Sequence, residues 1–77
     1  MRFSKHAIEQ MRDRGIPQTD AEVVISWPSK ISRGRAGARN LYGQGPVSGY
    51  RIRVTVAANG LVKTVAWADW RKPGDAS

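Results

Sequence analysis

The sequence predicts an α+β fold in which two short N-terminal helices pack on one face of a three- to four-stranded antiparallel sheet. Helix start and stop signals fill the first third of the chain, and segments of alternating apolar and polar residues fill most of the rest. Two of these segments flank Asn59-Gly60, a strong β-hairpin signal. A chain of 77 residues has room for one hydrophobic core, so we expect residues 1–77 to form a single domain.

The first helix is predicted to begin after Ser4, whose hydroxyl is well suited to cap a helix N-terminus. Ala7, Ile8 and Met11 then form an apolar stripe, which we expect to face the sheet. Gly15 favours the left-handed conformation that commonly ends a helix, so the helix is expected to stop there.

The second helix is predicted to begin with Thr19 as its N-cap, because residues 19–22 (Thr-Asp-Ala-Glu) have the pattern of a capping box. Val23, Val24 and Trp27 are expected to form its buried side, and Pro28 to end it. Both helices are too short to be stable alone, so each requires the sheet as a packing partner.

The strands are predicted from alternation and from the turn residues between them. We expect a short edge strand at residues 30–33, a flexible basic loop at 33–37, a turn region at 45–49, and further strands at 39–44, 50–58 and 61–70. Residues 71–77 are expected to form a flexible tail.

The register of the last two strands determines which side chains share a face. A two-residue type I′ turn at Asn59-Gly60 would place Val56 opposite Lys63 on the face that packs against the helices. The other face would then carry Arg51, Arg53, Thr55, Thr64 and Trp70, separated by small alanines.

The charge of the chain is strongly asymmetric. Its formal net charge is +7, and none of its six acidic residues lies between Val23 and Ala68. Such a surface attracts phosphate backbones through counterion release and electrostatic steering. We therefore expect a polyanionic partner, with RNA as the leading candidate; a basic face that serves solubility alone is the alternative.

Several kinds of site are excluded by composition. The chain has no cysteine and one histidine, so a disulfide framework, a zinc cluster and a thiol nucleophile are absent, and we expect neither metal nor cofactor. No apolar run approaches the roughly 20 residues that cross a membrane. The N-terminus lacks the apolar core of a signal peptide, so we expect a cytoplasmic protein without membrane contact.

Catalysis would have to use histidine, arginine and threonine. RNA supplies its own nucleophile, the 2′-hydroxyl, so cleavage requires a proton-transfer group and cations that stabilise the phosphorane. We predict His6 as the base, Arg53 as the stabilising cation and Thr64 as a hydrogen-bond donor to a phosphate oxygen. On a helical wheel, however, His6 falls near Gln10 and Asp13, away from the apolar stripe, which argues against this role.

RNA would be held by the remaining basic and aromatic residues of the acid-free segment. We expect Arg35, Arg39 and Arg51 to contact its backbone. Trp70 or Tyr42 is expected to stack on its bases.

Residues 3–16 (Phe-Ser-Lys-His-Ala-Ile-Glu-Gln-Met-Arg-Asp-Arg-Gly-Ile) resemble the signature of a bacterial family of domains of unknown function. Its members begin with Phe-Ser/Thr-x-His-Ala and close the first helix with Met-x-x-Arg-Gly-Ile. The Trp27-Pro28 helix end, the segment 53–56 (Arg-Val-Thr-Val) and Thr64 extend the resemblance over most of the chain.

The resemblance implies a fold like that of the RelE and barnase-type ribonucleases. It also implies metal-independent ribonuclease activity and neutralisation by an acidic antitoxin or immunity protein. His6, Arg14, Arg53 and Thr64 match recurrent polar positions of the family, and Arg14 is therefore expected to contact RNA. Gln10 is a departure, since the family often has arginine there.

Three functions are compatible with the sequence. The first is a metal-independent endoribonuclease of bacterial toxin type. The second is an RNA-binding protein without catalysis that uses the same basic face. The third is a protein-interaction module whose basic face meets an acidic partner. Since fold and family resemblance do not determine chemistry, the arrangement of the site residues has to distinguish them.

Overall fold

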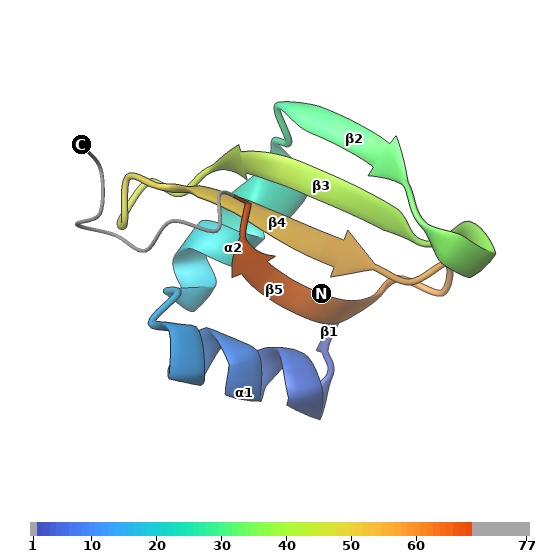
Figure 1. The fold of residues 1–77 in the computed structure, drawn as a ribbon, viewed down its shortest axis with the longest axis horizontal. Helices are drawn as coiled ribbons and strands as arrows, with labels where there is room; N and C mark the ends of the chain where they lie inside the picture. The colour runs from blue at the N-terminus through green and yellow to red at the C-terminus, as the bar shows by residue number, and fades with distance from the viewer. Residues whose placement is uncertain (1, 69–77) are drawn as a thin grey trace.

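The computed structural model describes residues 2–68, which form a five-stranded mixed sheet and two helices (Figure 1). The elements follow in the order β1 (Arg2–Phe3), α1 (Lys5–Arg14), α2 (Gln18–Ser26), β2 (Lys30–Arg33), a 3₁₀ turn η1 (Arg35–Gly37), β3 (Arg39–Gln44), β4 (Arg51–Val56) and β5 (Leu61–Trp67). The expected tail at 71–77 and the final residues of the expected last strand lie outside the described residues.

Helix α1 has the predicted ends. The Ser4 hydroxyl accepts a hydrogen bond from the Ala7 amide at 3.0 Å, and Gly15 adopts a left-handed φ of 69°. Ala7 and Met11 are buried as predicted, whereas Ile8 is 42% exposed, so the expected apolar stripe is wrong at that residue. The buried stripe is narrower than predicted because the helix lies beside the edge of the sheet. It directs the polar side chains of Gln10 and Arg14 toward β5.

Helix α2 begins two residues earlier than the sequence predicts, because its N-cap is Pro17 and not Thr19. It starts directly after Pro17 without a side-chain cap, so the expected capping box at Thr19 is wrong. Trp27, expected on the buried side, is 81% exposed because the helix ends there and the chain turns away toward β2. The residues that α2 buries are Asp20, Ala21 and Val24.

The sheet has the strand order β1-β5-β4-β3-β2. The α+β class and the two helices are confirmed, but the sheet is neither three- nor four-stranded and not wholly antiparallel. Arg2–Phe3 pairs in parallel with the start of β5, while every other neighbouring pair is antiparallel. A two-residue strand is too short to show alternation, which explains why the sequence does not reveal it.

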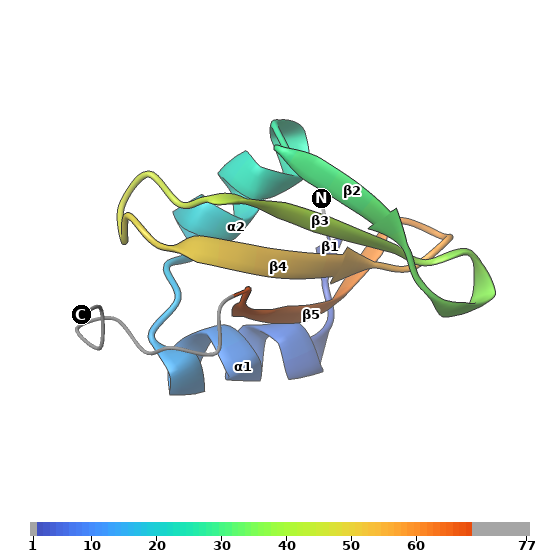
Figure 2. The ribbon, with the colours of Figure 1, turned by 45° about the horizontal axis from the view of Figure 1, so that its top comes forward.

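The two helices occupy different positions relative to the sheet. Helix α2 crosses one face behind β3 and β4, and α1 runs alongside β5 (Figures 1 and 2). Gly43 allows the close approach of α2, because a Cβ at this position would lie 3.1 Å from a Val24 methyl group. The buried core contains the β4 and β5 valines together with Ala7, Met11, Ile16, Ala21, Val24, Leu41 and Ile52.

The hairpin between β4 and β5 differs from the predicted hairpin at its tip. The Ala57 amide donates to the Leu61 carbonyl at 2.8 Å, and Gly60 has a φ of 89° while Asn59 does not have a positive φ. The Ala57–Leu61 hydrogen bond encloses residues 58–60, so the loop has three residues instead of two. A type I′ turn requires positive φ at both central residues, so the predicted type I′ turn at Asn59-Gly60 is wrong.

A bulge corrects the register that the longer loop would otherwise shift. Val56 pairs with Val62, and Thr55 pairs with Thr64, which leaves Lys63 as the extra residue. The predicted pairing of Val56 with Lys63 is therefore wrong. Since the extra loop residue and the extra strand residue compensate, the predicted pairing of Arg53 with Ala66 is confirmed.

Candidate nucleic-acid interface

The face of the sheet away from α2 carries the polar residues of β2 to β5. Residues directly opposite each other in neighbouring strands share a face. Tyr42 pairs with Lys30 of β2 and with Arg53 of β4, and Arg53 pairs in turn with Ala66 of β5. We call this surface the bare face and define it by Lys30, Asn40, Tyr42, Arg51, Arg53, Thr55 and Thr64.

Tyr42 lies at the centre of a group of cations on the bare face. The Nζ atom of Lys30 and the Cζ atom of Arg51 each lie 5.7 Å from the centre of the Tyr42 ring. Both distances are within the range of cation–π attraction, which holds the side chains beside the half-buried ring. A ring surrounded by cations can stack on a base while its neighbours contact the phosphates on either side.

Arg53 contributes an unusual donor to the same group. Its side chain is half-buried, and within residues 2–68 its Nε atom is buried without a hydrogen-bond partner. Buried polar atoms in proteins nearly always have a partner, and an unpaired one requires an explanation. Because this atom has almost no exposed surface, a hydrogen bond from it to an anionic ligand on the bare face would require the half-buried side chain to move.

A row of hydroxyl and amide groups lies beside the cations. Thr55 pairs with Asn40 on one side and with Thr64 on the other. The Thr55 hydroxyl donates to the Asn40 side-chain oxygen at 2.7 Å, so the Asn40 amide nitrogen and the Thr64 hydroxyl are the donors that this row offers. Such a row can exchange hydrogen bonds with ribose hydroxyls and phosphate oxygens.

The predicted catalytic residues are not brought together. Arg53 and Thr64 share the bare face, but His6 lies on α1, where it is exposed and has Gln10 as its hydrogen-bond partner at 2.9 Å. Neither Arg53 nor Thr64 forms a hydrogen bond to His6 in the part of the chain that the structure describes. The helical-wheel argument that groups His6 with Gln10 therefore agrees with the observed contact.

Gln10 determines which nitrogen of His6 carries the proton. The Gln10 side-chain oxygen accepts a hydrogen bond from the Val65 amide at 3.0 Å, so its amide nitrogen is the group that faces His6. Because this amide donates, the tautomer that fits the contact has Nε2 as the acceptor and its proton on Nδ1. A proton-accepting role for Nε2 requires His6 to release Gln10 first.

Arg14 has a structural partner that the sequence did not reveal. Its guanidinium donates to the Val65 carbonyl at 2.7 Å. Gln10, one helical turn earlier, accepts a hydrogen bond from the Val65 amide. Together the two side chains satisfy backbone groups at the outer edge of β5, which β1 is too short to cover. Their i, i+4 spacing is the only signal of this role in the sequence.

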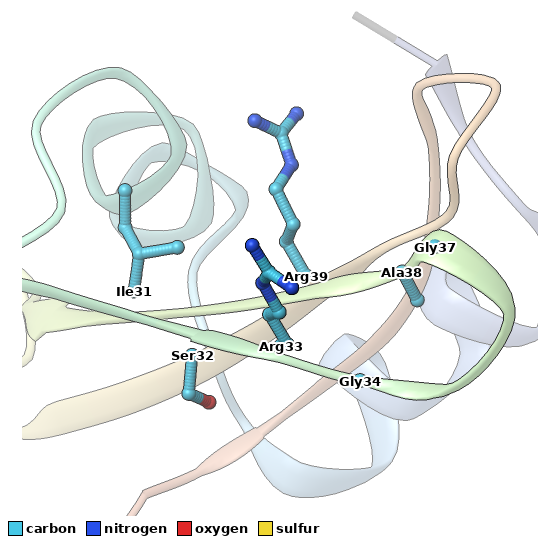
Figure 3. A pocket seen from close by; sticks show the side chains of 7 residues that line it. All are labelled: Ile31, Ser32, Arg33, Gly34, Gly37, Ala38 and Arg39. Atoms are coloured by element: carbon cyan, nitrogen blue, oxygen red, sulfur yellow. The ribbon is translucent and has the colours of Figure 1, made fainter.

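The remaining predicted RNA contacts lie apart from the bare face. Arg39 pairs with Val56 and Arg33, so it extends from the same side of the sheet as α2. Figure 3 shows Arg39 and Arg33 extending together, and Arg35 belongs to the turn η1 between their strands. Arg51 is thus the one predicted backbone contact that lies on the bare face. Trp70 lies outside the described residues.

Asp20 is the buried acidic residue of the described chain, and its surroundings indicate a structural role. It accepts hydrogen bonds from the amides of Val47 at 2.8 Å and of Ser48 at 2.9 Å. Burial alone would raise its pKa, but the hydrogen bonds from the Ser48 hydroxyl and from both amides outweigh this effect, so the pKa is lowered. The carboxylate thereby fixes the loop between β3 and β4.

Comparisons and searches for other kinds of site add no alternative. Residues 2–68 contain no cluster of three His, Asp or Glu side chains that could hold a metal ion, and no helix among them is long and apolar enough to cross a membrane. A scan against protein-family models, a search of curated proteins and a search of solved structures each give no match. The geometry of the bare face is therefore the basis for the proposed function.

Proposed function

We propose that this protein binds single-stranded RNA on the bare face and cleaves it as a metal-independent endoribonuclease of bacterial toxin type. The observation that supports the proposal most strongly is the group of three cations around Tyr42, formed by Lys30, Arg51 and Arg53. No acidic residue lies in the segment that forms these strands, so nothing in β2 to β5 neutralises the group. A phosphate backbone is its natural ligand.

Single-stranded RNA fits this surface better than a duplex does. Entry into a DNA major groove requires a protruding helix or ribbon, whereas the bare face is an open sheet with an aromatic ring among cations. The row of Asn40, Thr55 and Thr64 beside the ring favours RNA over DNA, because these groups can bond to 2′-hydroxyls.

Cleavage would use the RNA 2′-hydroxyl as the nucleophile. Its oxygen attacks the adjacent phosphorus, the bond to the 5′-oxygen breaks, this oxygen takes up a proton from water, and a 2′,3′-cyclic phosphate remains. Arg53 is the candidate to stabilise the additional negative charge of the phosphorane, and Thr64 to donate to one of its oxygens. His6 is the candidate to take the 2′-hydroxyl proton, in exchange for its bond from Gln10.

The second candidate function is RNA binding without cleavage. One observation favours it, namely that His6 is engaged with Gln10 on α1 and forms no hydrogen bond to either Arg53 or Thr64. Arg14, which the family resemblance assigns to RNA, is likewise engaged with the Val65 carbonyl. If these contacts persist when RNA binds, the bare face holds RNA but lacks a proton acceptor.

Two assays on the purified protein test the proposal and separate the two candidates. Fluorescence anisotropy with a single-stranded RNA and with DNA of the same sequence is expected to show tighter binding to the RNA, with an affinity that falls steeply with salt. Incubation of total RNA in EDTA is expected to yield fragments with cyclic phosphate ends.

Matched variants assign the outcome to particular residues. Arg53→Ala should weaken binding, while Arg12→Ala removes an exposed cation from α1 and should not. Loss of cleavage in His6→Ala with unchanged RNA affinity would support the endoribonuclease. RNA binding without any fragments would select the non-enzymatic function, and equal affinity of wild type and Arg53→Ala would refute the role of the bare face.

A further inference from the structure

A second basic surface lies on the other side of the sheet, in the hairpin of β2 and β3. Its hollow of about 600 Å³, which we call the hairpin hollow, is lined by Ile31, Ser32, Arg33, Gly34, Gly37, Ala38 and Arg39. Ile31, Arg33 and Arg39 extend to the same side of the hairpin, and Ser32 extends to the opposite side (Figure 3). The hollow therefore combines an apolar side chain with two arginines.

The two arginines face each other in an unfavourable arrangement. Arg33 is directly opposite Arg39, and the next pair along the hairpin is joined by a hydrogen bond of 2.8 Å from the Gly34 amide to the Ala38 carbonyl. Because hydrogen-bonded and non-hydrogen-bonded pairs alternate, Arg33 and Arg39 form a non-hydrogen-bonded pair, in which side chains are closest. Like charges in this position repel, and an anionic group between them would relieve the repulsion.

The same alternation determines what β2 presents at its outer edge. β2 is the last strand of the sheet, and its residues in non-hydrogen-bonded pairs, Ile31 and Arg33, direct their amide and carbonyl groups away from β3. Ile31 is also 56% exposed. An exposed strand edge with unpaired backbone groups is a template for the addition of another strand.

The charges around this edge select the kind of strand that can be added. Pairing of β2 with a second copy of itself would bring Lys30 and Arg33 against the same cations of the other copy. RNA is also a poor fit, since the lining of the hollow has no aromatic ring on which a base could stack. Exposed apolar groups at Ile31 and at Trp27, which is 81% exposed at the end of α2, favour a protein partner.

We propose that the free edge of β2 binds an extended acidic segment of a partner protein as an added strand. In an antiparallel arrangement the segment has an acidic residue opposite Arg33, an apolar residue opposite Ile31 and a second acidic residue opposite Lys30. Its sequence pattern is therefore acidic, any residue, apolar, acidic. This site lies at the outer edge of β2, shares Lys30 with the bare face, and does not depend on RNA binding.

The test is an NMR titration of the isotope-labelled full chain with a peptide that has Glu-Thr-Val-Glu flanked by glycines. The amide signals of Ile31 and Arg33 are expected to shift most. The double variant Arg33→Ala, Arg39→Ala should weaken binding roughly fivefold, as expected for the loss of exposed ion pairs. The double variant Arg12→Ala, Lys63→Ala, which removes two exposed cations elsewhere, should leave binding unchanged.

Modified peptides test the added-strand geometry independently of charge. N-methylation of the valine, which would bond to Ile31, should abolish binding, whereas N-methylation of the threonine should be tolerated because that amide points away from β2. Equal loss in both double variants, or shifts that map mainly to the β3, β4 and β5 residues of the bare face, would reduce the interaction to general charge attraction and overturn the proposal. The absence of any saturable shift would overturn it as well.

Discussion

Within residues 2–68, the buried ionic atoms of Asp20 and Arg53 differ in their hydrogen bonding. The Asp20 carboxylate is fully buried and accepts hydrogen bonds from the Val47 and Ser48 amides. The Arg53 Nε atom is also buried, but within residues 2–68 it has no partner. A buried carboxylate whose hydrogen bonds are complete contributes to stability, whereas a buried donor without a partner costs stability and can gain a hydrogen bond from a ligand only if its side chain moves. We therefore interpret Asp20 as a structural residue and keep Arg53 as the proposed RNA-binding residue.

The largest expected effect is the loss of the Asp20 carboxylate. Asp20→Ala leaves the Val47 and Ser48 amides without their acceptor, and we expect it to lower the free energy of unfolding by about 3 kcal/mol. Urea unfolding followed by circular dichroism measures this change. Glu22→Ala is the matched control, because Glu22 is an exposed acid on the same helix and should change stability by less than about 0.5 kcal/mol.

The Asp20 interaction also predicts how stability depends on pH. Because its pKa is lowered in the folded state, its contribution is fully present above the ordinary aspartate value of 3.8 and is lost as pH falls through the folded-state pKa. Urea unfolding at a series of acidic pH values should show this loss in the wild type. Asp20→Asn should show a smaller decrease over the same range, and parallel curves for the two proteins would contradict the assignment.

The sequence predicts the elements better than it predicts which side chains they bury. Alternation identifies β2 and β3 with their observed bounds, and the Ser4 cap and Gly15 identify both ends of α1. Asp20, by contrast, has the sequence pattern of an exposed residue in a capped first turn. Its burial depends on a loop far along the chain and on Gly45, where any Cβ would overlap the Asp20 carboxylate.

The sequence predicts only part of the bare face, because some of its residues come together only through the pairing of strands. The side of the sheet that carries Arg51 and Arg53 follows from period-two alternation, and it is correct although the predicted turn is wrong. Lys30 and Tyr42 complete the group only through the pairing of β2 with β3 and of β3 with β4, which no local pattern specifies. The position of α1 at the sheet edge, which separates His6 from Arg53, is likewise a property of tertiary packing.

Within the bare face, removal of the aromatic ring is expected to have the largest effect on RNA binding. Tyr42→Ala should weaken binding by about 2 kcal/mol, because it removes a stacking surface for a base and releases Lys30 and Arg51 from the ring. Tyr42→Phe keeps the ring and should retain most of the affinity in fluorescence anisotropy. Equal losses in both variants would show that the hydroxyl group, and not stacking, is responsible.

Arg53→Met tests the proposed RNA-binding role of Arg53, which the comparison contrasts with the structural role of Asp20. The substitution removes a charge with an unpaired donor and keeps the side-chain volume similar. We expect RNA binding to weaken roughly tenfold and the salt dependence of log K to decrease by about one. The free energy of unfolding should stay within about 0.5 kcal/mol of the wild type or increase, because no internal hydrogen bond of the Nε atom is lost. A strong destabilisation would mean that Arg53 is a structural residue like Asp20.

The smallest expected effect concerns charges that are unpaired but exposed. Arg39 is opposite Arg33, and Arg39→Ala should increase the free energy of unfolding by about 0.5 kcal/mol at low salt by removing the repulsion between them. The gain should disappear at high salt, where the repulsion is screened. Arg35→Ala is the control, because Arg35 lies in the η1 turn and has no cation opposite it in the sheet register.

A destabilising Arg39→Ala would show that packing of the long side chain outweighs the repulsion. In that case the pair would give no energetic reason for an anion to bind in the hairpin hollow.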